Sequence, residues 1–171
     1  MPRYVAFLRG VSPQNASMAD LRRCLEEAGY ANVRTVLASG NVAFDTRASA
    51  LPALEKRLEK AIEAGLGRRF GTLVRPAEQL RRLVEAEPFA AFRLDPRAKP
   101  VITFLRQPPA PAPRLPIERD DVRILAVTGT EVLTAYVPGG KGPVFMSLLE
   151  ATFGRDITTR TLETVRKCAK A

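Results

Sequence analysis

The chain has 171 residues, of which 46% are hydrophobic, and it carries a formal net charge of +9. It contains no histidine and only two cysteines, Cys24 and Cys168, which excludes Ser-His-Asp and Cys-His catalysis and leaves no clustered ligands for zinc. No apolar run is long enough for a membrane span or the core of a signal peptide, so we expect a cytoplasmic protein that does not enter membranes.

The first half of the chain predicts four strands and two helices. Ser17 has the chemistry of a helix cap and Gly29 that of a helix end. Around Ser39-Gly40-Asn41 the spacing is that of a hairpin, with positive φ expected at the Gly and the Asn. The strands are expected over 3–9, 33–38, 42–44 and 72–75, and the helices from 17 to 28 and from 49 or 50 to 64. This β-α-β-β-α-β order is that of the split βαβ, or ferredoxin-like, unit.

The second half repeats this order imperfectly. Five prolines between residues 107 and 116 exclude a regular helix there. Strands are expected over 101–105, 122–127 and 132–137, and helices over 77–86, 144–152 and 159–169. We therefore predict an α+β protein of two ferredoxin-like lobes packed together, residues 1–76 and 77–171, with antiparallel sheets and helices on one face. The second lobe would contain the Pro-rich loop 107–116 and a C-terminal helix.

Four stretches of the sequence resemble the DUF1697 family of bacterial proteins of unassigned function. They read "RYVAFLRGV", "MADLRRCLEEAGYANVRT", "SGNVAFD" and, near the end, "TTRTLETV". The resemblance implies an α+β fold with ferredoxin-like lobes and adds no reaction. The chain departs from the family pattern in loop 11–17, which lacks the usual glycines and lysine, and in segment 161–163, which lacks an aromatic residue and two amides. These changes leave open whether a family site is retained.

Two groups of residues are candidates for binding an anion. Arg9-Gly10 ends the first strand beside the Ser39-Gly40-Asn41 turn, and Thr159-Arg160 opens the expected last helix, where backbone N–H groups point outward. We predict that Arg9, the turn and Arg160 lie around one cleft. The alternatives are that Ser39-Gly40-Asn41 is only a turn, and that the arginines pair with Asp20, Asp45 or Asp156.

Other motifs give weaker signals. The stretch 138–143, "PGGKGP", precedes a helix but fails the Walker A spacing. Phe7 and Phe44 stand where an RNA-recognition module carries its aromatics, yet the required basic-Gly-aromatic order is absent. The acids Glu26-Glu27, Asp45 and Asp120-Asp121 have no matching base.

The sequence thus leaves three functional hypotheses. The first is a small ligand-binding or interaction protein with an anion-preferring cleft and no cofactor or metal. The alternative is a nucleic-acid-binding protein driven by its basic charge. An enzyme has the least support, because no catalytic constellation is recognisable.

Overall fold

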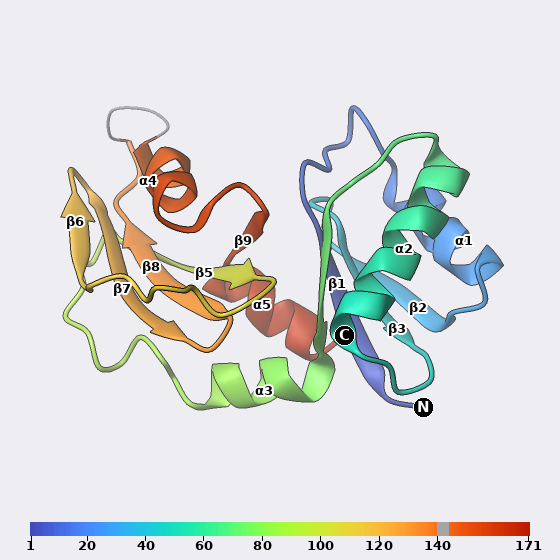
Figure 1. The fold of residues 1–171 in the computed structure, drawn as a ribbon, viewed down its shortest axis with the longest axis horizontal. Coiled ribbons are helices and arrows are strands. Elements are labelled where there is room, and N and C mark those ends of the chain that lie inside the picture. The colour runs from blue at the N-terminus through green and yellow to red at the C-terminus, as the bar shows by residue number, and fades with distance from the viewer. Residues whose placement is uncertain (140–143) are drawn as a thin grey trace. The chain divides into compact units, whose positions relative to one another are not determined.

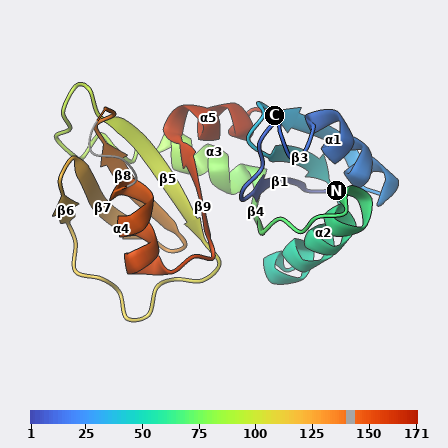
Figure 2. The ribbon, with the colours of Figure 1, turned by 90° about the horizontal axis from the view of Figure 1, so that it is seen from above.

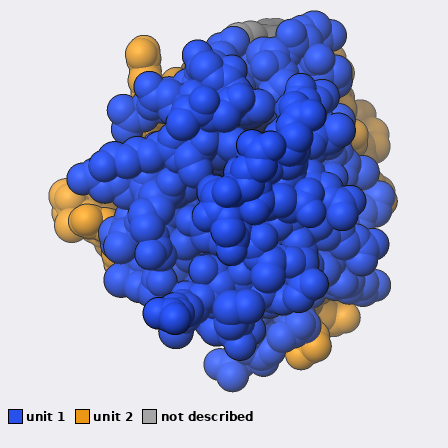
Figure 3. All heavy atoms as spheres, turned by 90° about the vertical axis from the view of Figure 1, so that its right-hand side faces the viewer, with its two compact units in different colours: residues 1–83, 166–171 blue, residues 84–165 orange. Residues whose placement is uncertain are grey.

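The computed structural model describes residues 1–139 and 144–171 and shows an α+β protein with two antiparallel sheets and, within those residues, five helices (Figure 1). The described chain divides into two compact units. Unit 1 consists of residues 1–83 and 166–171, and unit 2 of residues 84–165, as coloured in Figure 3. None of the described helices is both long enough and apolar enough to cross a membrane.

The sheet of unit 1 has the strand order β2-β3-β1-β4, and each neighbouring pair is antiparallel. Its elements are β1 (Arg3–Leu8), α1 (Met18–Glu27), β2 (Ala31–Val36), β3 (Asn41–Asp45), α2 (Leu51–Leu66) and β4 (Thr72–Pro76). The first and third strands are thus neighbours, as the sequence predicted. Helices α1 and α2 lie together on one face of this sheet, which Figure 2 shows from above.

The ends of the two helices of unit 1 carry local backbone signals, although α2 continues through Gly65 to Leu66 and so passes its predicted end at 64. The hydroxyl of Ser17 accepts a hydrogen bond from the Asp20 N–H at 3.0 Å and caps α1. Helix α2 has a proline in its first turn and ends at Gly67, which takes the left-handed conformation at φ +70°. Both ends therefore follow from local backbone chemistry.

The core of unit 1 fills the space between α1, α2 and the sheet. Alternate residues of the strands face the helices, as a period of two requires. Its fully buried members include Leu8, Leu21, Leu25, Val42, Phe44, Leu54, Leu58 and Ile62. Phe44 lies between two tyrosine rings, with centroids 6.0 Å from Tyr4 and 5.0 Å from Tyr30. Burial of these side chains stabilises the unit by roughly 1.5–3 kcal/mol each.

One charged pair lies inside this unit. Glu55 on α2 and Arg75 on β4 are both almost fully buried, with 3.8 Å between Arg75 Nη1 and Glu55 Oε2. The same carboxylate accepts the backbone N–H of Val74 at 2.8 Å. The carboxylate is thus satisfied by a main-chain donor as well as by the guanidinium, as buried charges require.

Unit 2 is built on a second sheet, with the order β6-β7-β8-β5-β9. Its elements are β5 (Lys99–Leu105), β6 (Ile117–Arg119), β7 (Val122–Thr128), β8 (Glu131–Tyr136), α4 (Val144–Phe153) and β9 (Ile157–Thr161). Two further helices, α3 (Ala77–Glu85) and α5 (Leu162–Ala169), run across the division between the units. The short strand β6 was not predicted.

One prediction about the C-terminal region is wrong. Residues 159–161 are strand, not the start of the last helix, because β9 pairs with β5 from Ile157 to Thr161. The last residues, 166–171, belong to unit 1, and the division into lobes 1–76 and 77–171 stays a prediction.

Candidate functional site

The end of β1 and the hairpin before β3 lie side by side. Phe7 pairs with Asn41, and the backbone N–H of Leu8 donates to the Gly40 carbonyl at 2.9 Å. The next residue, Arg9, donates its backbone N–H to Gly71 at 2.8 Å. Two of the predicted site elements, Arg9-Gly10 and Ser39-Gly40-Asn41, therefore lie at the same end of this sheet.

The hairpin uses its polar side chains to hold its own backbone. Asn41 is completely buried, and its amide Nδ2 donates to the Val36 carbonyl and to the Ser39 hydroxyl, each at 2.9 Å. Positive φ occurs at Leu37 (+58°) and Gly40 (+87°) rather than at Asn41, which corrects that expectation. Asn41 instead belongs to β3 and needs extended backbone. The observed hydrogen bonds give this segment the role of a turn.

Gly10 and its loop are also held internally. Gly10 has φ +83° and is exposed. Its carbonyl accepts from the Asn15 amide at 2.7 Å, and the Asn15 side-chain oxygen accepts from the Ser12 N–H at 2.9 Å. Asn15 thus closes the loop on itself.

Thr159 and Arg160 lie on β9 in unit 2 and not at a helix start. The Arg160 guanidinium donates to the Thr158 hydroxyl at 2.9 Å and to the Thr159 carbonyl at 2.7 Å. Because both residues are in a strand, their backbone N–H groups do not belong to the first turn of a helix. That Arg160 shares a cleft with Arg9 stays a prediction.

The three aspartates considered as partners of these arginines have other ion-pair partners. Asp20 pairs with Arg23, Asp45 with Arg3, and Asp156 with Arg106. The pKa of Asp45 is lowered, first by the hydrogen bond from the Asn32 amide and then by that from Arg3. These pairings do not include either predicted site arginine.

The remaining sequence candidates find no support as sites. Phe7 and Phe44 are completely buried, so they offer no stacking surface for bases. In the "PGGKGP" stretch, residues 140–143 lie outside the described residues. Nowhere in 1–139 and 144–171 do three or more acidic or cysteine side chains gather as a metal site would require.

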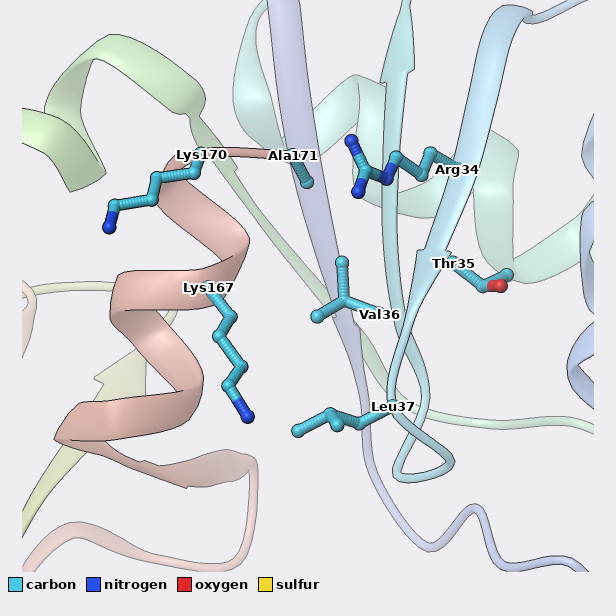
Figure 4. Close-up of a pocket in the computed structure, with 7 residues that line it drawn as sticks. All are labelled: Arg34, Thr35, Val36, Leu37, Lys167, Lys170 and Ala171. Atoms are coloured by element: carbon cyan, nitrogen blue, oxygen red, sulfur yellow. The ribbon is translucent and has the colours of Figure 1, made fainter.

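The structure reveals a cleft that the sequence did not predict, with a volume of about 370 Å³. All of its lining residues belong to unit 1, because the segment 166–171 is part of that unit. They come from β2, from the start of the hairpin and from the end of the chain: Arg34, Thr35, Val36, Leu37, Lys167, Lys170 and Ala171 (Figure 4).

Strand alternation explains which side chains reach the cleft. Arg34 and Val36 pair with Ala43 and Asn41, whereas the core facing α1 and α2 takes Val42. Since cross-strand partners share a face, Arg34 and Val36 point away from α1 and α2. The end of α5 lies on that side, so the expectation of helices on one face only is wrong for this sheet (Figure 4).

A hydrogen-bond network holds Ala171, which lines the cleft, in place against the sheet. Arg3 Nε donates to the Ala171 carbonyl at 2.9 Å, while its Nη1 donates to the Asn32 carbonyl at 3.1 Å and to Asp45 at 2.9 Å. One guanidinium thus joins the last residue to β2 and β3. Cys168 and Ala169, both buried, anchor the same segment.

The cleft is cationic. Arg34, Lys167 and Lys170 are exposed, and no acidic side chain lines the cleft. Within the described part of the chain, neither Arg34 nor Lys170 has a side-chain hydrogen bond or ion pair. Cationic side chains around a concavity make a favourable place for an anion.

Sequence reasoning missed these residues because they are far apart in the chain. In the sequence, Arg34 has the pattern of an ordinary exposed strand residue, and Lys167 and Lys170 have that of the polar face of a helix. The only local signal was Leu37, an apolar residue directly before a turn.

Comparison with known proteins agrees with this fold. A family model described as "Protein of unknown function (DUF1697)" matches residues 1–132. A solved structure, that of the conserved bacterial protein SP0830 from Streptococcus pneumoniae, superposes with a TM-score of 0.70 at 19% identity, covering 99% of this chain and 97% of that one. At that identity the likeness concerns the fold alone. No curated protein matches the sequence.

Proposed function

The chain belongs to the DUF1697 family, whose description names no activity, and we propose from the cleft that the protein binds a small anionic ligand through Arg34, Lys167 and Lys170. The observation that carries this proposal is that three cationic side chains and no acidic side chain line one concave site in unit 1. The sequence also led us to expect an anion site, but around Arg9, the Ser39-Gly40-Asn41 turn and Arg160 and not in this cleft.

The size and exposure of the cleft support a small ligand. Its volume of about 370 Å³ falls in the range of small-molecule sites. Because the cations are exposed, each contributes only about 0.5–1 kcal/mol to binding a charged group. Affinity for a simple anion should therefore be modest and should fall as salt screens the site.

Calorimetric titration with inorganic phosphate and with butanoate tests this proposal. Arg34→Gln and Lys167→Gln should each weaken binding about twofold to fivefold, and the two together with Lys170→Gln should abolish it. Lys60→Gln is the matched control, since it removes one exposed charge from α2. Equal binding by the wild type and the triple variant would refute the cleft as the site, and no binding of either anion would refute the function.

Nucleic-acid binding driven by charge is the alternative from the sequence, and no observation of the structure favours it over the cleft. Its signature is a steep loss of affinity for single-stranded RNA between low and moderate salt. Salt-sensitive RNA binding that the substitutions at Arg34, Lys167 and Lys170 do not weaken would favour this alternative. The cytoplasmic location stays a prediction.

We also interpret both units as variants of the split βαβ unit. The order β7-β8-β5-β9 in unit 2 corresponds, strand for strand, to β2-β3-β1-β4 in unit 1. In unit 2 the Pro-rich segment and β6 stand where unit 1 has α1. This correspondence supports the ferredoxin-like interpretation.

A further inference from the structure

Leu37 combines two unfavourable properties at the rim of the cleft. It is 50% exposed, one of two exposed large hydrophobic side chains among the described residues. Its backbone is in the left-handed region, at φ +58°. A bulky residue there is a genuine outlier, and such strained positions concentrate at functional sites.

The turn itself does not require a leucine. Asn or Gly would adopt this φ with less strain, and a polar residue would suit the exposure. Because neither the backbone nor the core of unit 1 accounts for Leu37, the cleft that it lines is the remaining explanation.

The side chains divide the cleft along β2. In Figure 4 the Val36 and Leu37 side chains point toward α5, while the Arg34 guanidinium points toward Ala171. The Lys170 ammonium points away from the strand, and Lys167 extends from α5 toward the Leu37 end. Three residues, about 10 Å of extended chain, thus separate the Arg34 guanidinium from the apolar Leu37 side chain, toward which Lys167 extends.

We propose that the ligand is an amphiphilic anion, whose carboxylate or phosphate is bound at Arg34 and whose unbranched aliphatic chain lies over Val36 and Leu37. This inference rests on the proposed anion-binding function and adds the class of ligand. Lys167 supplies positive charge from α5, and its aliphatic stem covers the chain from that side, as long cationic side chains commonly do.

The chain-length dependence of carboxylate binding tests the apolar end. In the wild type, affinity should rise about twofold per added methylene, because an open site gives about half the free energy of full burial. The rise from butanoate to octanoate should therefore be about sixteenfold. Leu37→Asn should flatten this dependence, so that the variant binds octanoate little more tightly than butanoate. Ala38→Asn is the matched control, because it adds the same amide to the same turn at an exposed residue that does not line the cleft.

Folding is tested in the same variants. The free energy of unfolding of Leu37→Asn should equal or exceed that of the wild type, since Asn tolerates the left-handed conformation. A loss of octanoate binding in a variant that is at least as stable as the wild type then reports the missing contact and not misfolding.

The outcomes separate this inference from the function on which it rests. Butanoate and phosphate binding with a flat chain-length series would overturn the amphiphilic ligand and keep the anion site. Tighter binding of suberate, the dicarboxylate of octanoate's length, would also overturn it, because the Leu37 end would then prefer charge. Vesicles of phosphatidylglycerol distinguish a membrane lipid from a soluble ligand. A soluble ligand would be overturned if the protein sediments with these vesicles, loses this sedimentation in Leu37→Asn, and does not bind monomeric octanoate.

Discussion

Replacing Gly40 by alanine tests the account of the Ser39-Gly40-Asn41 turn. A Cβ at Gly40 would lie 3.0 Å from Leu8 Cβ and from both Cβ and Cγ2 of Val11, and the backbone has φ +87°. Gly40 cannot move away freely, because its carbonyl accepts the Leu8 N–H at 2.9 Å. The left-handed backbone costs about 1–2 kcal/mol for alanine, and the added contacts in a packed region cost about 1–3 kcal/mol.

The same substitution at Gly10 separates these two costs. Gly10 has nearly the same φ, +83°, but a Cβ there would meet no atom within 4 Å. Gly10→Ala should therefore lose only about 1–2 kcal/mol of stability, and Gly40→Ala about 2–5 kcal/mol. Urea denaturation followed by circular dichroism measures both. Equal losses in the two variants would show that Gly40 is needed for its backbone conformation alone and that its close approach to β1 carries no energy.

Three further predictions concern polar side chains of unit 1. Asn41→Ala should lower the free energy of unfolding by about 1–3 kcal/mol in urea denaturation, because it leaves the Val36 carbonyl without its amide donor. A loss below about 0.5 kcal/mol, the usual effect of a surface substitution, would contradict this. Asp45→Asn should cost about 1 kcal/mol at pH 7. Since the pKa of Asp45 is lowered in the fold, mainly by Asn32, this difference from the wild type should persist above pH of about 4 and vanish as the pH falls through the folded pKa, as denaturation at a series of pH values would show. Burial raises the pKa of the Cys24 thiol, so a disulfide reagent at neutral pH should react slowly with the native protein and rapidly in urea; fast reaction of the native Cys24 would be inconsistent with its burial.

The first unit could be predicted closely because its signals are local. Ser17 and Gly29 mark the ends of α1 in the sequence, and the alternation around residues 39–41 marks a hairpin. Strand order then follows from the few arrangements that the β-α-β-β-α-β order allows. The prediction that Arg9 and Asn41 lie at one end of the sheet depended on nothing more.

The C-terminal segment could not be predicted in the same way. From residue 159 onward the apolar positions Leu162 and Val165 have helical spacing, and this favoured one continuous helix. The β-branched run from Ile157 to Thr161 favours a strand, but five residues become a strand only if a partner is present. That partner is β5, about sixty residues earlier, with Val101 opposite Thr161, and single-sequence patterns do not identify such a pairing.

The hairpin connects the predicted motif with the cleft that was missed. Asn41 fixes the Val36 carbonyl, and Gly40 presses the turn against Leu8 and Val11. With its two ends held, the turn leaves Leu37 in a left-handed conformation with its side chain outside the core. Ser39-Gly40-Asn41 need not touch a ligand to matter for the proposed binding, because these residues set the position of Leu37, which the proposed ligand would contact. The Ser39-Gly40-Asn41 motif is thus a turn, and its proposed effect on binding is exerted through Leu37, two residues before Ser39.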